Sequence, residues 1–131
     1  MTTLSAAGSP SGDLMIRTVA MPADTNPDGD IFGGWLMSQM DHAGGTAAMR
    51  RSGGRVVTAA VDGMAFLFPV HVGDEVSLYA QVISIGRTSM KIMVEAWRQT
   101  RESETRIQVT KALFTFVAIG DDGRPRVVPM P

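Results

Sequence analysis

The stretch NPDGDIFGGWLMSQMDHAGGTA, residues 26–47, opens with turn residues, continues with helical spacing and carries a carboxylate, Asp41, inside an apolar run. Apolar and small residues recur there at intervals of three and four: Leu36, Met40, Ala43 and Ala47. Two arginines followed by Gly53 and Gly54 are typical of a helix end. The pattern predicts one helix over residues 34–51.

A row of very small residues on this helix limits how a sheet can pack against it. The row consists of Ala43, Gly44, Gly45, Ala47 and Ala48. Such side chains cannot hold a sheet at the usual distance, so we expect a sheet that curls closely around the helix. Strand-like segments with short connections, which favour antiparallel neighbours, occupy the rest of the chain. They span residues 14–21, 56–66, 75–85, 89–100 and 109–118. The sequence therefore predicts an α+β fold, a five-stranded antiparallel sheet wrapped around one central helix.

The chain length of 131 residues fits one domain with one core. Residues 1–13 are small and polar, which predicts a disordered tail before a domain over residues 14–131. A curled sheet leaves one face and an edge strand without cover, and a chain of this length has no second layer to supply it. We therefore expect dimers, with a ligand cleft shared between subunits.

The composition excludes several classes of function. A formal net charge of -1 gives no overall field that would recruit nucleic acid or an anionic membrane. The absence of cysteine excludes disulfides, thiolate metal sites and cysteine nucleophiles. No run approaches the ~18 apolar residues of a membrane span, and the first residues do not resemble a signal peptide. These features predict a cytoplasmic protein without nucleic-acid or membrane partners.

The predicted helix places Asp41 on the side opposite its apolar stripe, because successive residues are 100° apart. The pattern alone allows two roles for Asp41. It is a structural carboxylate, which is exposed or hydrogen-bonded to another subunit, or it is a reactive group. Gly33 and Gly34 at the start of the helix allow two interpretations as well. They form a tight turn, or they leave bare amide groups at the positive end of the helix dipole, where an oxyanion can bind.

A metal site is not expected. Asp24, Asn26 and Asp28 match the first half of a calcium-binding loop, but Trp35 stands where the last ligand is required. His42 and His71, the two histidines, have no carboxylate partner at metal-ligand spacing. The sequence also lacks the G-x-S-x-G motif of serine hydrolases and the glycine-rich motifs of nucleotide-binding folds.

Three segments in order closely resemble the hotdog-fold acyl-CoA thioesterases, in particular the small bacterial YciA type. They are PADTNPDGDIFGGWLMSQMDHAGG, GRVVTAAVDGMAFLFPVHVGDEV and IGRTSMKIMVEAW, and the resemblance covers residues 14–128. It implies that Asp41 is the catalytic carboxylate and that Asn26 acts with it across a dimer interface. The amides of Gly33 and Gly34 would then polarise the thioester carbonyl. The carboxylate can activate water or attack directly, and the sequence leaves both routes open.

Coenzyme A carries several phosphates, which a nearly neutral protein must meet with local cations and amides. The candidate substrate-binding residues are Arg55, Val57, Thr58, Gly86, Arg87, Thr88 and Ser89. No cofactor is expected, since coenzyme A is part of substrate and product. The expected partners are an acyl-CoA and further copies of the chain, as a dimer or a trimer of dimers.

Two other functions fit parts of the pattern. A hotdog dehydratase acting on acyl thioesters would need a histidine beside the carboxylate, and His42 adjoins Asp41 in sequence but points about 100° away on a helix. A non-catalytic acyl-CoA-binding module could use the same cleft, although the presence of both Asn26 and Asp41 favours catalysis. The acyl length preferred is not evident from the sequence.

Overall fold

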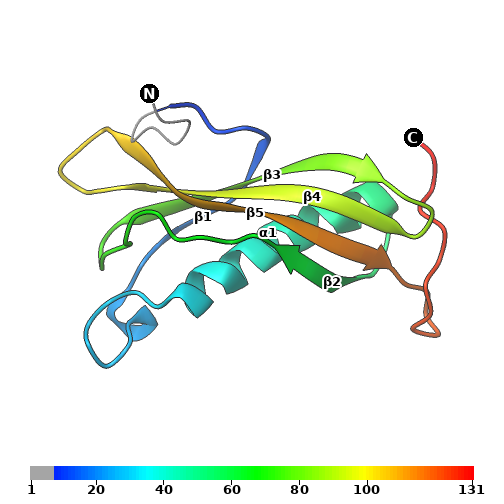
Figure 1. Cartoon of the computed structure of the whole chain (residues 1–131), viewed down its shortest axis with the longest axis horizontal. Helices are drawn as coiled ribbons and strands as arrows, with labels where there is room; N and C mark the ends of the chain where they lie inside the picture. Colours follow the sequence, from blue (N-terminus) through cyan, green and yellow to red (C-terminus); the bar gives the residue numbers. More distant parts are fainter. Residues whose placement is uncertain (1–7) are drawn as a thin grey trace.

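The computed structural model describes residues 8–131, which form a curved antiparallel sheet around one long helix (Figure 1). The elements in chain order are β1 (Asp13–Val19), the short 3-10 helix η1 (Pro22–Asp24), α1 (Gly33–Ser52), β2 (Val56–Asp62), β3 (Glu75–Ile85), β4 (Ser89–Gln99) and β5 (Arg106–Ala118). The strand order in the sheet is β1-β3-β4-β5-β2, with all neighbours antiparallel. The predicted architecture is confirmed.

The predicted and observed boundaries differ most at β2. The strand was expected to reach residue 66 but ends at Asp62, because the next residue, Gly63, has a φ of +61°, which breaks the extended backbone. The apolar residues that follow belong to an irregular connection, from which Leu67 donates a hydrogen bond to the Val109 carbonyl. β5 begins at Arg106, earlier than predicted, since its pairing with β4 continues to that residue. Residues 1–7 of the predicted disordered tail lie outside the described residues.

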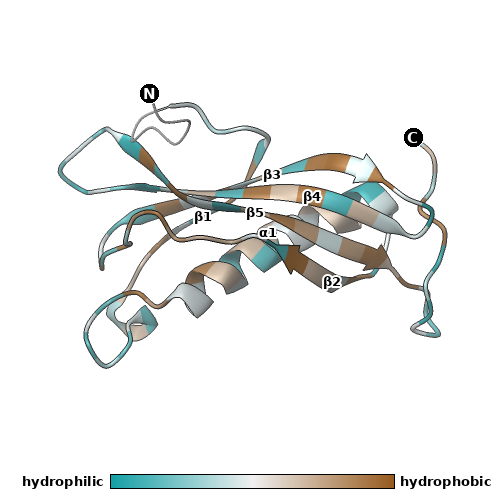
Figure 2. Cartoon of the chain, in the orientation of Figure 1, coloured by the Kyte–Doolittle hydropathy of each residue, from teal (hydrophilic) through white to brown (hydrophobic). Residues whose placement is uncertain are grey.

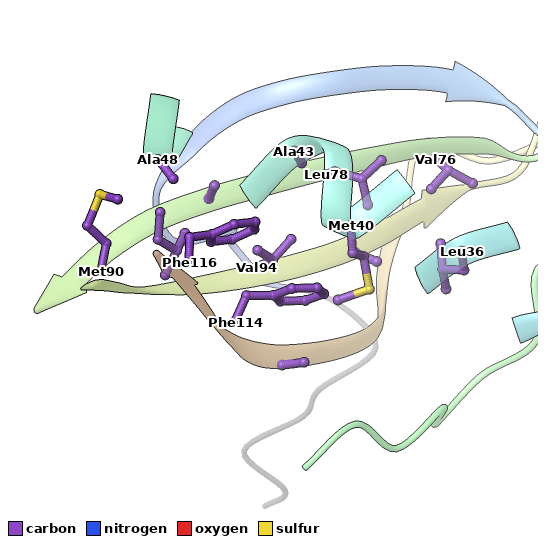
Figure 3. Packing of buried hydrophobic residues seen from close by; sticks show 14 of the residues in the cluster. Leu36, Met40, Ala43, Ala48, Val76, Leu78, Met90, Val94, Phe114 and Phe116 are labelled. Atoms are coloured by element: carbon purple, nitrogen blue, oxygen red, sulfur yellow. The ribbon is translucent and has the colours of Figure 1, made fainter. Parts of the chain in front are cut away.

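The core lies between the inner face of the sheet and the apolar stripe of α1. Leu36, Met40 and Ala43 are almost fully buried, as the helical spacing predicts. Figure 3 shows them facing the side chains of the central strands. Phe114 and Phe116 of β5 stack with their ring centroids 6.0 Å apart. These contacts fix which side of α1 faces away from the sheet.

Gly44 shows why the small residues of α1 matter. A Cβ atom at this position would lie 2.9 Å from the Phe116 ring and 3.1 Å from Val94. The Phe116 side chain is itself fully buried and cannot easily move. Only glycine therefore allows β4 and β5 to approach α1 this closely, which confirms the predicted tight curl.

Gly44→Ala should destabilise the protein, although alanine favours helices by about 1 kcal/mol over glycine. Forcing a methyl group into a packed core typically costs about 1–3 kcal/mol, so we expect a net loss of about 1 kcal/mol. Gly45→Ala is the matched control, because its Cβ would lie at an ordinary 3.6 Å from Phe116. Thermal unfolding should show a melting temperature lower by about 5 °C for Gly44→Ala and no decrease for Gly45→Ala. Equal behaviour of the two variants would contradict the close-approach argument.

The β2 edge of the sheet is uncovered. Every residue of β2 after Val56 is exposed, including Val57 and Val61. The hydrophobic colouring of β2 continues into the connection over residues 63–70 (Figure 2). An exposed apolar edge strand is a surface on which another chain can pair. Among the described residues, no helix combines the length and apolar character that a membrane crossing requires.

Candidate functional site

Asp41 lies in the middle of α1, on the side of the helix that faces β2. Its carboxylate is partly buried, whereas the preceding Met40 is fully enclosed in the core. Thr58 of β2 donates a hydrogen bond of 2.5 Å from its Oγ1 to Asp41 Oδ1. The second carboxylate oxygen has no hydrogen-bond partner within residues 8–131. Asp41 is thus oriented away from the core, as predicted, with one oxygen held and the other available.

A local irregularity of the sheet places Thr58 in this position. The register of the β2–β5 pairing shifts between Thr58 and Ala60, and such a bulge changes the direction of the side chains beside it. The sequence pattern assigned Thr58 to substrate binding and gave no sign of this contact, because the two partners are 17 residues apart on different elements. The structure gives Thr58 a position from which it orients the carboxylate.

Two grooves meet at Asp41 and Thr58. The first, of about 320 Å³, is also lined by Gly34, Ser38 and Val61. The second, of about 420 Å³, extends toward the C-terminal end of α1. Its further lining residues are Ile16, His42, Gly45, Thr46, Met49, Val56 and Phe116. Since Ile16 is in β1 and Val56 is in β2, the curl brings both edges of the sheet to this side of the helix. A long ligand can therefore pass the carboxylate with one part in each groove.

The start of α1 carries free amide donors, as one of the two interpretations of Gly33 and Gly34 requires. Phe32 precedes the helix and provides no side-chain cap. In the described part of the chain, the N–H groups of Gly33 and Gly34 have no acceptor, and the first bonded amide is that of Trp35, 3.1 Å from the Phe32 carbonyl. Beside Gly33 lies an apolar cavity of about 230 Å³ that Phe66 and Val109 also line. The amides can therefore hold an oxyanion next to an apolar space.

Asn26 lies in the loop between η1 and α1, where its side chain organises the backbone. Its Oδ1 accepts hydrogen bonds from the N–H groups of Asp28, at 3.0 Å, and Asp30, at 3.1 Å. The side-chain NH2 group makes no hydrogen bond within the described residues, so it can donate to a ligand. Among the described residues, Asn26 and Asp41 form no hydrogen bond with each other. Neither this loop nor any other described segment brings three metal-ligating side chains together.

The structure brings Arg55 and the turn over residues 86–89 to the same end of β5. Ile119 donates its N–H to the Arg55 carbonyl at 3.0 Å, and Ala118 donates to the Thr88 carbonyl at 2.9 Å. Gly86 donates to the Ser89 carbonyl at 2.8 Å and closes the turn. The side chains of Arg55 and Arg87 are exposed on either side. Arg55 and this turn therefore form one basic edge near the C-terminal end of α1, whereas Thr58, another candidate, lies apart from them beside Asp41. Val57, also a candidate, is exposed on β2 between this edge and Thr58.

His42 lines the second groove beside Asp41 but forms no side-chain hydrogen bond within residues 8–131. Its backbone carbonyl accepts a hydrogen bond of 2.9 Å from Thr46 Oγ1. The imidazole and the carboxylate are thus not coupled as an acid–base pair in one chain.

Comparisons with known proteins identify the family and the fold. The family model described as thioesterase superfamily matches residues 28–105. The chain is 52% identical over 124 residues to the acyl-CoA thioester hydrolase YciA of Escherichia coli, which covers 92% of this chain and 94% of that protein. The structure of this chain is similar to that of a hexameric broad-specificity acyl-coenzyme A thioesterase, with a TM-score of 0.89 and 50% identity. The match covers 94% of this chain and 85% of that one. A hexameric hotdog-fold thioesterase of Campylobacter jejuni gives a TM-score of 0.84, 43% identity and coverage of 90% and 91%.

Proposed function

The chain belongs to the thioesterase superfamily and is a hotdog-fold acyl-CoA thioester hydrolase, and from this premise we propose that Asp41 is its catalytic carboxylate. The observation that carries the proposal is the position of Asp41 at the junction of two grooves, with one oxygen held by Thr58. The residue that the resemblance identified is also the carboxylate best placed to meet a long thioester.

The reaction adds water to the thioester carbonyl and expels the thiolate of coenzyme A, leaving a carboxylic acid. The free oxygen of Asp41 can take a proton from water as the water attacks, and that proton can then pass to the departing thiolate. Alternatively, the same oxygen attacks the carbonyl itself and expels the thiolate, and water then cleaves the resulting anhydride to regenerate the Asp41 carboxylate and release the acid. In both routes the Thr58 hydroxyl fixes the rotation of the carboxylate, which keeps the reactive oxygen directed into the groove.

The donors for the oxyanion come, in this proposal, from a second copy of the chain. Gly34 and Asp41 of one chain are seven residues apart, which is about 10 Å along a helix axis. A carbonyl carbon and its oxygen cannot contact both groups over this distance. The NH2 group of Asn26 and the amides of Gly33 and Gly34 therefore act on a thioester held at Asp41 of the partner chain.

This shared site requires an oligomer built from dimers. The exposed β2 edge, with Val57 and Val61 at its surface, supports pairing between two chains at this strand. The related thioesterases are described as hexameric, which supports a trimer of dimers for this protein as well. The cytoplasmic location and the absence of a cofactor stay predictions.

The phosphates of coenzyme A are bound, in this proposal, by Arg55 and by the turn over residues 86–89. Both arginines are exposed, and Arg87 stands in the turn beside the hydroxyl groups of Thr88 and Ser89, which are further donors for a phosphate. The second groove leads from Asp41 toward this edge, so the pantetheine arm would lie along it, past Thr58 and Val56.

Arg55→Ala and Arg87→Ala should each raise KM for an acyl-CoA by about tenfold, as expected for one charge-assisted hydrogen bond, and leave kcat unchanged. With the corresponding acyl-pantetheine, which lacks the phosphates and adenine, KM should not change. Thiol release measured with both substrates tests this prediction. Arg101→Ala, an exposed arginine in the β4–β5 hairpin at the other end of the sheet, is the control and should behave as wild type. An equal KM defect on both substrates would contradict the phosphate assignment.

A further inference from the structure

The C-terminal segment runs past the end of the sheet where β3 and β4 meet (Figure 1). Arg126 donates its backbone N–H to the Ala118 carbonyl at 2.9 Å, and Val128 donates to the Arg87 carbonyl at 2.8 Å. The Val128 side chain is 4% exposed and belongs to the main core. The turn that carries Arg87 is thus held on one side by β5, through Thr88, and on the other by this segment.

The Arg126 side chain fastens the segment to the rest of the molecule. Its Nε donates to the Ile119 carbonyl at 3.0 Å, Nη1 to the Ser52 carbonyl at 3.1 Å and Nη2 to Ser52 Oγ at 3.3 Å. Ser52 is the last residue of α1 and is almost fully buried. Carbonyls in the last turn of a helix lack helical partners, and a cation there also interacts well with the helix dipole. Arg51 adds a second link, from its Nη1 to the Pro129 carbonyl at 2.7 Å.

We propose that residues 126–129 form a strap that positions the coenzyme A-binding turn, with Arg126 as the residue that attaches the strap to α1. The inference rests on the proposed function, because it takes Arg87 to be a phosphate ligand. All three nitrogens of the Arg126 guanidinium donate to protein oxygens. Arg126 is therefore a positioning residue that acts through Arg87 and does not itself bind the phosphate.

The strap affects one end of the substrate only. Without the Arg126 side chain, the segment loses its attachment to Ser52 and Ile119, so the Val128 N–H is held less firmly against the Arg87 carbonyl. The Arg87 turn must then become ordered when the nucleotide end of coenzyme A binds, and the free-energy cost of this ordering weakens binding. Asp41 and Thr58 lie along the middle of α1 and on β2, outside these contacts. The chemical step should therefore proceed at its usual rate.

The test compares Arg126→Ala with wild type, using an acyl-CoA and the acyl-pantetheine of the same chain length. We expect KM for the acyl-CoA to rise about five- to tenfold, in the range typical of coupling between a distant group and a binding site. Values of kcat for both substrates, and KM for the acyl-pantetheine, should not change. Arg126→Lys, which keeps the charge and a donor near Ser52, should recover part of the affinity. Arg124→Ala is the control, because Arg124 is exposed and its side chain forms no hydrogen bond in the described part of the chain.

A double-mutant cycle identifies the route of the effect. If Arg126 acts through Arg87, then adding Arg126→Ala to Arg87→Ala should raise KM by much less than it does in the wild-type background. Additive effects, equal losses on both substrates, or a change confined to the melting temperature would each overturn the strap proposal. Should Arg126→Ala not fold, Arg126→Lys takes its place in the same cycle.

The two proposals can fail separately. If Arg55→Ala and Arg87→Ala impair acyl-CoA binding but Arg126→Ala does not, the phosphate site stands and the strap is rejected. If neither arginine affects KM for the acyl-CoA, the phosphate site is wrong and the strap has no turn to position.

Discussion

Asp41→Asn should lower kcat by at least ~100-fold, the lower end of the effect of removing a general base. Asparagine keeps the size of the side chain and an oxygen that can accept the Thr58 hydrogen bond. It removes both the basicity and the nucleophilicity of the group, so either route of hydrolysis fails. The fold and the oligomer should persist, because Asp41 is only partly buried and faces a groove. Thiol release measures kcat, while sedimentation and thermal unfolding check that the oligomer and the fold persist.

Thr58 provides a graded comparison for the same carboxylate. Thr58→Val keeps the shape of the side chain but removes the hydroxyl that donates to Asp41 Oδ1, whereas Thr58→Ser keeps the hydroxyl. We expect kcat to fall for the valine variant by less than for Asp41→Asn, and to stay near wild type for serine. An active Asp41→Asn enzyme would overturn the mechanism. If Thr58→Val is as active as Thr58→Ser, the Thr58 hydroxyl has no role in the mechanism.

The sequence predicted those parts of the fold that depend on local periodicity. The helix and β3 follow from regular spacing, and their observed bounds, Gly33–Ser52 and Glu75–Ile85, agree with the prediction to within one residue. The end of β2 could not be predicted in this way. The residues after Gly63 are apolar because they cover the start of α1, where Phe66 packs on Gly33 and Val70 enters the core. Such an apolar run in an irregular connection has the same composition as a strand, although only Val70 in it is buried.

Features of the candidate site that depend on a single helix or strand could be predicted from the sequence. Contacts between two such elements could not. The direction of Asp41 follows from helix geometry alone, so its separation from the core was predicted. The contact with Thr58 depends on the bulge after Thr58 and on how far the sheet curls, and neither has a sequence signature here. The same holds for Arg126, whose three acceptors belong to residues 7 and 74 positions away in the chain.

The shared site makes a second prediction with a large effect, which begins with a variant of Asn26. Asn26→Asp keeps an oxygen that can accept from the amides of Asp28 and Asp30, so the loop should hold its shape. It removes the NH2 donor, and loss of one oxyanion donor typically lowers kcat by ~100-fold or more. Asn26→Asp and Asp41→Asn chains should therefore each form inactive oligomers of normal size.

Mixing these two inactive chains should restore activity if each site takes Asp41 from one chain and Asn26 from its partner. In a mixed dimer, one site receives both mutations and the other receives neither. Random pairing at equal amounts then leaves about a quarter of all sites intact, so co-refolded mixtures should approach about a quarter of wild-type activity. A site built within one chain allows no such recovery, because every chain carries one defect. Mixed oligomers, verified by differently tagged chains, that are no more active than their parents would show that Asp41 and Asn26 do not meet across an interface.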